Sequence, residues 1–325
     1  MSEQETVITG AESPKGKRRR RTVRRISVIL LLAVAAVFLI GWALVYGYNN
    51  VSLMDDETFA RRLESAIENG RDWVEQYQDE ILNKKNIALI RMLQDADKMH
   101  SEPVYEQIVK TFMSRRLRPS CWKALIDPNW PVLPRDLNQT IEREYTDNKW
   151  ILYTLAPEKA KITPEQMGLF DPDRWQGRQL THQLWALIHL RERHGGDKKL
   201  DELIEHLCDR IGGSLRFDVA VVDMYIQKVA FVLKAGLPEK INRRWIERII
   251  TDQRSDGGWN DKWFVFTSRR RPSLSPRQPP SDQHPTAQAL WLLYQVKYRY
   301  PEEFGLAEQP AGDRRKMPGG TIWKP

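Results

Sequence analysis

The stretch "DQRSDGGWNDKW", residues 252–263, decides how the second half of this chain folds. It closes an amphipathic helical segment with Gly257 and Gly258 and places Trp259 immediately after them. Glycine tolerates the left-handed backbone conformation in which many helices end, so the pair lets the chain reverse its direction. Trp259 is large enough to cover the end of the next pair of helices. We therefore expect a tight turn between two packed helices.

Five helical segments surround this turn and follow one pattern. They occupy residues 181–196, 200–213, 219–236, 241–258 and 284–300, with apolar residues at helical spacing and glycine after several of them. The first, third and fifth segments are apolar nearly all round, whereas the second and fourth are charged on one face. This alternation is typical of helical hairpins that stack with one helix inside a ring and the next outside it.

The turn and the helix after it resemble the QW-type repeat of squalene-hopene cyclases and the related protein prenyltransferases. The resemblance covers about residues 180–300 and implies an α/α toroid, complete or incomplete. The repeats that end at Gly196 and Gly213 lack the glutamine and the tryptophan of the motif. The matching positions are Gln253, Asp256, Gly257, Gly258 and Trp259 in the turn, then Thr286, Ala287, Ala289 and Leu290 in the next helix.

The N-terminal part of the chain has the features of a membrane anchor. Residues 1–25 carry a basic cluster, and residues 26–48 are an uncharged apolar run, longer than the roughly 20 residues that cross a bilayer. A cleaved signal peptide is the alternative, but its apolar part is shorter and ends at small residues. This run ends with Trp42, Tyr46 and Tyr48, which is typical of an interfacial aromatic belt. We expect one transmembrane helix.

The distribution of charge argues against nucleic acid as a partner. The formal net charge is +8, but the first 25 residues hold eight of the 51 basic residues and only three of the 43 acidic ones. The remainder is nearly neutral, unlike a domain that binds phosphate backbones. Cys121 and Cys208 are the only cysteines. An oxidising compartment would let them pair if the fold brings them together.

The chain as a whole is expected to be all-α, with a single transmembrane helix followed by a helical-hairpin domain of the α/α-toroid type. Residues 51–116 form a helical hairpin region, and residues 117–135, which contain four prolines, form an ordered loop. The toroid-like domain then covers residues 136–305. Residues 306–325, rich in glycine, proline and charge, are a flexible tail.

The catalytic groups of the resembled families are largely missing. The aspartate-rich segment with which such cyclases protonate their substrate is absent. Asp223 and His284 stand where prenyltransferases have two zinc ligands, but Tyr225 replaces the cysteine thiolate, and His182 opens an earlier inner helix. A substitute zinc site of His182, Asp223 and His284 is one alternative. The other is that these side chains are hydrogen-bonded polar groups at helix ends, with no metal and no cofactor.

A basic loop gives the clearest hint of a ligand. Residues 267–284 are rich in arginine and proline and contain Arg269, Arg270 and Arg271 in a row. The arginine guanidinium can donate two parallel hydrogen bonds to a carboxylate or a phosphate, so the loop fits an anionic glycan or a phospholipid head group. Asp261 and His284 flank it and are further ligand-binding candidates. The alternative is a solvated insertion without a ligand.

Two classes of function remain. The favoured one is a non-catalytic binding or scaffold module, anchored in the membrane, with a ligand or partner-protein surface near residues 260–284. The alternative is an enzyme that acts on an isoprenoid or a polysaccharide through acid and base groups outside the known motifs. The missing aspartate segment and thiolate favour the binding module.

The basic cluster predicts the topology. Positive residues stay in the cytoplasm, so the cluster from Lys15 to Arg25 places the C-terminus on the other side, which is the periplasm for a protein of a bacterial inner membrane. A C-terminal alkaline phosphatase fusion should therefore be active, and a fluorescent protein that folds only in the cytoplasm should stay dark at the same position. The reverse pair of results would contradict this topology.

Overall fold

The computed structural model describes residues 14–116, 119–261 and 280–306, with side chains from residue 26 onward. These residues are helical or irregular and contain no strand, which confirms the all-α prediction. The chain divides into two compact units, residues 1–48 and residues 49–325. The expected regions 51–116 and 136–305 thus belong to one unit.

The first unit contains almost all of α1 (Pro14–Asn50). Within it, Ile26–Asn50 is the one helix of the described residues that is long and apolar enough to cross a membrane. Its aliphatic side chains are exposed, as expected of a helix whose surroundings would be lipid. The expectation of a single apolar helix near the N-terminus is confirmed.

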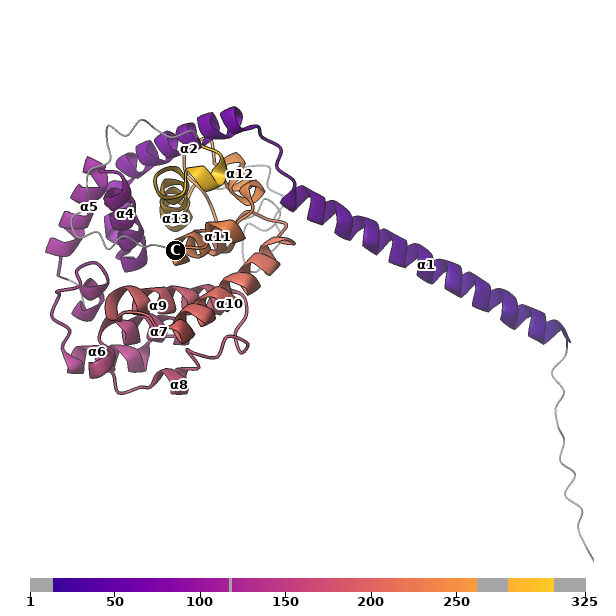
Figure 1. The fold of residues 1–325 in the computed structure, drawn as a ribbon, viewed down its shortest axis with the longest axis horizontal. Coiled ribbons are helices and arrows are strands. Elements are labelled where there is room, and N and C mark those ends of the chain that lie inside the picture. Colours follow the sequence, from indigo (N-terminus) through magenta and orange to yellow (C-terminus); the bar gives the residue numbers. More distant parts are fainter. Residues whose placement is uncertain (1–13, 117–118, 262–279, 307–325) are drawn as a thin grey trace, which may run out of the picture. The chain divides into compact units, whose positions relative to one another are not determined.

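The second unit contains the remaining helices, with the positions shown in Figure 1. They are α2 (Asp56–Gln76), α3 (Gln78–Lys84), α4 (Ile87–Met99), α5 (Pro103–Ser114), η1 (Ser120–Leu125), α6 (Pro134–Arg143), α7 (Thr146–Leu155), α8 (Pro164–Met167), α9 (Arg178–His194), α10 (Lys198–Leu215), α11 (Asp223–Ala235), α12 (Arg243–Thr251) and α13 (Gln283–Tyr294). Short turns η2 (Pro157–Lys159), η3 (Pro238–Lys240), η4 (Gln295–Arg299) and η5 (Glu302–Phe304) complete it.

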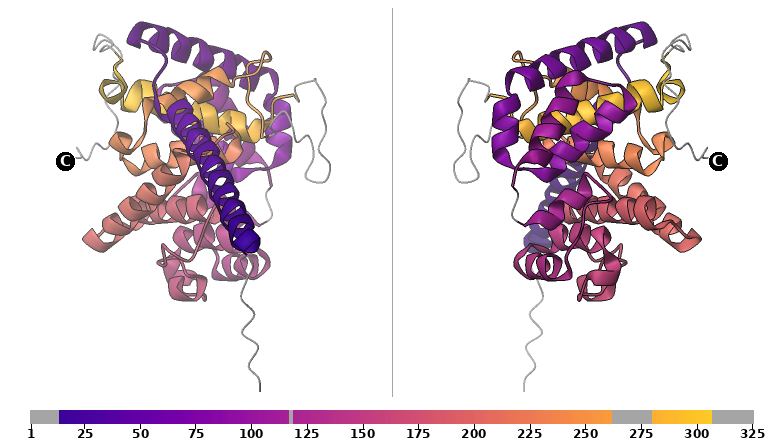
Figure 2. Two further views of the ribbon diagram at one scale, coloured as in Figure 1. Left: turned by 90° about the vertical axis from the view of Figure 1, so that its right-hand side faces the viewer. Right: turned by 90° about the vertical axis from the view of Figure 1, so that its left-hand side faces the viewer.

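Five helices of this unit and the 3-10 turn η1 (Ser120–Leu125) form a closed sequence of contacts. α4 packs against α13, α13 against α11, α11 against α9, and α9 against α7, while η1 contacts both α7 and α4 (Figure 1). The other long helices pack against members of this set: α5 against α4, and α10 against α9 and α11. α2 lies along α13 and α12 (Figure 2).

Burial follows the alternation expected from the sequence at α10, α11 and α13 but not at α12, which was expected to expose a charged face and instead buries every residue from Arg244 to Ile250. α13 is buried along its whole length except at His284, and α11 is buried on nearly all sides. α10 instead buries one face, which carries Ile204, Leu207, Cys208 and Ile211 at helical spacing. Helices that are apolar all round need neighbours on every side, whereas one-sided helices face water.

The opening stretch ties three helices together. The side-chain amide of Gln253 donates to the carbonyl oxygens of Ala66 in α2 (2.8 Å) and Gly257 (2.8 Å). Trp259 is fully buried, and its indole N–H donates to the carbonyl oxygen of Ile249 in α12 (2.8 Å). Its backbone N–H donates to the hydroxyl of Thr286 in α13 (2.9 Å). The turn therefore fixes α2, α12 and α13 relative to one another.

The two glycines of the turn serve different purposes. Gly257 has the left-handed conformation, with φ at +91°, and a β-carbon there would lie 2.5 Å from the carbonyl oxygen of Asn69. Gly258 has no positive φ, but its β-carbon would lie 2.5 Å from that of Ser281. Asp256 accepts hydrogen bonds from the Ser281 hydroxyl (2.5 Å) and backbone N–H (3.2 Å), which hold this close approach.

The structure also shows the fold of the proline-containing loop and the state of the two cysteines. The described part of residues 117–135 includes the 3-10 turn η1, in which Cys121 is buried. Cys208 is buried in α10, and both thiols are free, so no disulfide joins these elements. Residues 307–325, nearly all of the expected flexible tail, lie outside the described residues.

Substitution of Gly257 by alanine should destabilise the protein more than the same change at Gly236, the left-handed residue that ends α11. Both glycines have φ at +91°, so both changes carry the conformational cost of about 1–2 kcal/mol. Only Gly257 adds a clash with a backbone carbonyl, because the nearest atom to a β-carbon at Gly236 is the Tyr300 hydroxyl oxygen, 4.0 Å away. Thermal unfolding of the two variants in detergent measures the difference, and equal losses would contradict the packing described above.

Candidate functional site

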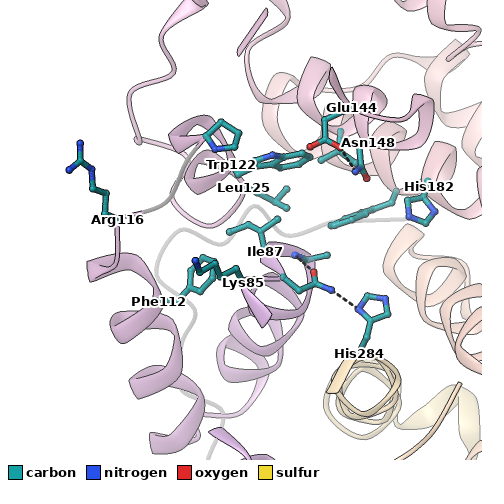
Figure 3. Close-up of a pocket in the computed structure, with 15 residues that line it drawn as sticks. Lys85, Ile87, Phe112, Arg116, Trp122, Leu125, Glu144, Asn148, His182 and His284 are labelled. Carbon is teal, nitrogen blue, oxygen red and sulfur yellow. Dashed lines mark hydrogen bonds between the residues drawn. The ribbon is translucent and has the colours of Figure 1, made fainter. Parts of the chain in front are cut away.

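A cavity of about 620 Å³ lies near the N-terminal ends of α4, α7, α9 and α13. Its volume is within the range of small-molecule sites, roughly 300–1,000 Å³. Figure 3 shows His182 and His284 on one side of it, with Glu144 beside Asn148. The lining residues are Lys85, Asn86, Ile87, Ala88, Phe112, Arg116, Pro119, Trp122, Leu125, Glu144, Asn148, Ile151, His182, Trp185 and His284.

A second cavity, of about 760 Å³, adjoins the first. The two share Arg116, Pro119 and Glu144 in their linings, so they are neighbours, and we call the pair the cleft. Aromatic rings line both parts, with Trp122 in the first and Trp130 in the second. Basic side chains outnumber acidic ones: Lys85, Arg115, Arg116, Lys123 and Arg143 against Asp136 and Glu144.

His284 is held by a chain of hydrogen bonds. The side-chain oxygen of Asn86 accepts from the backbone N–H groups of Ala88 (3.1 Å) and Leu89 (3.3 Å), which caps α4. Its NH₂ group therefore faces Nδ1 of His284, 3.2 Å away. An NH₂ group donates, so Nδ1 accepts, and the ring proton of neutral His284 lies on Nε2.

The other ring nitrogen of His284 faces α11. The Gln288 amide lies 2.9 Å from Nε2, and its oxygen accepts there when its nitrogen donates to Asp223 Oδ1, also at 2.9 Å. Asp223 Oδ1 itself lies 3.6 Å from His284 Nε2. Asn86, His284, Gln288 and Asp223 thus connect α4, α13 and α11. Both nitrogens of His284 are engaged, so this ring orients its neighbours.

Asp223, the first residue of α11, has a perturbed carboxyl group. Burial raises its pKa above the ordinary value. The His284 ring opposes this rise, whereas the Asp261 carboxylate adds to it. A raised carboxyl pKa beside a histidine is typical of functional sites, although structural networks produce it too.

His182 differs from His284 because one of its nitrogens is not engaged. Its Nδ1 lies 3.0 Å from the carbonyl oxygen of Arg178, one turn earlier in α9. A carbonyl only accepts, so Nδ1 carries the proton and Nε2 the lone pair. Burial lowers the pKa of His182, so the ring is neutral at pH 7. Nε2 makes no hydrogen bond to any described residue and is an acceptor at the cavity.

The sequence-predicted residues have different places. His182 and His284 line one cavity, and Asp223 joins His284. Asp261 is exposed but close enough to raise the pKa of Asp223. Arg269, Arg270 and Arg271 lie outside the described residues. In the part of the chain that the structure describes, no three His, Cys, Asp or Glu side chains form a group that could hold a metal ion, so the alternative zinc set is not assembled there.

Much of the cavity was missed by sequence reasoning. Asn86 precedes the apolar run "IALI" and has the position of a helix N-cap, a signal that would have placed it at the start of α4. Trp122 lies in the proline-containing loop, and Trp185 has the spacing of a core residue. Neither has a local pattern that distinguishes a cavity wall from ordinary packing.

The chain matches no family model, no curated protein and no solved structure. The cleft, the polar cluster around His284 and the apolar helix α1 are therefore the observations that bear on function.

The environment of His182 predicts its tautomer and its titration. The ring should carry its proton on Nδ1 at pH 7 and titrate below the ordinary histidine value of about 6.5. Long-range ¹H–¹⁵N spectra of the full chain in detergent report both properties, and the variant His182→Gln identifies the signals by their loss. A proton on Nε2, or a midpoint above the ordinary value, would rule out this description.

Proposed function

We propose that this protein is a membrane-anchored domain that binds an anionic glycan chain outside the cytoplasm. The observation that carries the proposal is the cleft of two neighbouring cavities, whose linings include tryptophans and an excess of basic side chains. We further propose that the second unit is an α/α toroid with α4, α7, α9, α11 and α13 as its inner helices.

The sequence of contacts among those five helices, which η1 closes, supports the toroid. So does the difference between α11, which is buried on nearly all sides, and α10, which is buried on one face. The first cavity is lined from α4, α7, α9, α13 and η1, that is, by most members of the contact sequence. Its place near the N-terminal helix ends also suits an anion, because unsatisfied N–H groups give those ends a partial positive charge.

The lining of the cleft supports a glycan. Flat indole faces offer apolar surfaces with one polar edge, which suit sugar rings, and Trp122 lines the first cavity. Trp130 lines the second cavity and has the Lys123 ammonium over one face, 4.4 Å from the ring centroid. Asp136, one of the two acidic residues, already accepts from the Ser120 hydroxyl and the Cys121 N–H, both at 2.9 Å. Lys123 is buried and donates to the Met113 carbonyl oxygen (2.6 Å), so the exposed Lys85, Arg116 and Arg143 supply the positive charge that a ligand meets. Two adjoining cavities also fit a chain of sugars better than a single one.

The side of the membrane follows from the basic cluster before α1. Arginine and lysine at residues 15–25 favour a cytoplasmic N-terminus, which puts the second unit in the periplasm or its equivalent. Surface glycans are assembled and displayed in that compartment, so a binding domain there has access to them.

Lys85 and Lys84 provide a matched test of the ligand site. Both are exposed neighbours, but Lys85 lines the cavity and Lys84 is not among its lining residues. We expect an oligomer of uronic acids to bind the full chain in detergent more tightly than a neutral oligosaccharide of the same length. Lys85→Glu should weaken that binding by roughly fivefold to tenfold, the effect of about 1 kcal/mol, and Lys84→Glu should leave it unchanged. Calorimetry gives these constants.

Equal affinity for the charged and neutral oligomers would overturn the anionic ligand class. Equal loss in the two lysine variants would place binding elsewhere on the surface.

A second candidate, a polysaccharide-acting enzyme, is favoured by one observation. His182 presents a neutral Nε2 without a hydrogen-bond partner among the described residues, as a general base requires. Chain cleavage of the bound uronic oligomer, followed by mass spectrometry and abolished by His182→Gln with binding retained, would support it. An intact oligomer after prolonged incubation supports the binding module alone.

A further inference from the structure

The beginning of the second unit carries a cluster of exposed apolar side chains. Seven large hydrophobic residues of this unit's described part are exposed, and four of them fall in two short segments. We call these four the juxtamembrane patch: Val51 (58% exposed), Leu53 (71%), Phe217 (39%) and Val219 (54%). Scattered exposed hydrophobic residues are ordinary, but a cluster needs an explanation.

The two segments of the patch are fastened together by buried polar groups. Asn49, which is fully buried, donates from its side-chain amide to the carbonyl oxygens of Arg216 (3.1 Å) and Asp218 (3.0 Å). Asn50 donates to the Arg216 carbonyl as well, at 3.1 Å. The loop before α11 is thus held against the first residues of the unit.

A buried arginine also holds the loop before α11 against Asn49. Arg248 in α12 is 4% exposed and donates to the side-chain oxygen of Asn49 (2.7 Å) and to the carbonyl oxygens of Asp218 (2.8 Å) and Val219 (2.7 Å). Hydrogen bonds to a charged donor are among the stronger ones in proteins. Because the loop's backbone is held in this way, the exposure of Phe217 and Val219 is a fixed property of the fold.

The covalent chain places the patch next to the bilayer. Tyr48 ends the apolar run, and three residues of extended chain span at most about 11 Å, so Val51 stays within that distance of Tyr48. The head-group layer on each side of a membrane is roughly 6 Å thick, so the residues after Tyr48 begin at or within it. Arg216, which is exposed beside Phe217, supplies a positive charge for lipid phosphates.

We propose that the juxtamembrane patch rests on the phospholipid surface and that Phe217 and Val219 enter the head-group layer. The proposal requires that α1 crosses the membrane, and it is independent of the cleft and its ligand. With α1 in a membrane, a lipid surface is the occupant within reach of the patch, because the patch begins three residues after the apolar run.

Phe217 has a matched control in Phe170, since the two are exposed to 39% and 40%. The full chain, carrying Phe217→Cys or Phe170→Cys and a fluorophore on the new thiol, is placed in nanodiscs that contain lipids with nitroxide head groups. We expect several-fold stronger quenching at position 217 than at position 170. The native thiols give little background, because burial raises the pKa of Cys121 to about 11 and that of Cys208 to about 12.

Two further variants make each outcome decisive. Val219→Cys should behave like Phe217→Cys, and quenching at neither position above that at 170 would overturn the proposal. Phe38→Cys in α1, tested with nitroxides on the acyl chains, reports insertion of the anchor. Quenching at 38 without quenching at 217 and 219 refutes the patch alone. No quenching at 38 refutes the anchor, and the patch proposal with it.

Discussion

The buried indole of Trp259 is the contact on which the packing of the second unit most depends. It is fully buried, and its polar groups bond to α12 and α13 at the same time. In α2, Gly70 makes room for it, because a β-carbon there would lie 3.1 Å from the indole ring and 2.7 Å from Leu290. One aromatic side chain thus sets the spacing of three helices. Removal of a buried aromatic side chain from a core typically costs about 3–5 kcal/mol.

The geometry of the candidate site follows from that spacing. α13 starts at Gln283, 24 positions after Trp259. The Thr286 hydroxyl accepts from the backbone N–H of Trp259 and donates to its carbonyl oxygen, which fixes the first turn of α13. His284 lies in that first turn and reaches Asn86 of α4 and the Gln288–Asp223 pair. A shift of α13 would therefore disturb the cavity wall before it exposed the core. Structure and site are coupled through the same few residues.

The cleft and the juxtamembrane patch are two surface regions of the second unit with different chemistry. The cleft combines rings, basic groups and a neutral histidine, which suits polar recognition of a ligand. The patch combines aliphatic and aromatic side chains with Arg216, which suits a lipid surface. Each is held by hydrogen-bonded polar groups, the half-buried Asn86 and His284 in one case and the buried Asn49 and Arg248 in the other. The proposed glycan binding and the proposed membrane contact therefore rest on separate parts of the fold.

The sequence by itself determined the features that depend only on residues close together in the chain. The apolar run after the basic cluster, the helical periodicity and the glycine turn at residues 257–258 each depend on neighbours within a few positions, so the all-α class and the apolar helix could be predicted. His182, Asp223 and His284 were recognised because they stand at the starts of helices.

Only the tertiary structure decided which of these residues meet and which other side chains surround them. Lys85, Trp122, Glu144 and Asn148 come from separate elements, and no local spacing marks them as walls of one cavity. The same holds for Asn49 and Arg248, which are 199 positions apart and share a hydrogen bond. Contacts at such separation arise from the packing of whole helices, and the period of a sequence records which face of a helix is buried but not which partner covers it.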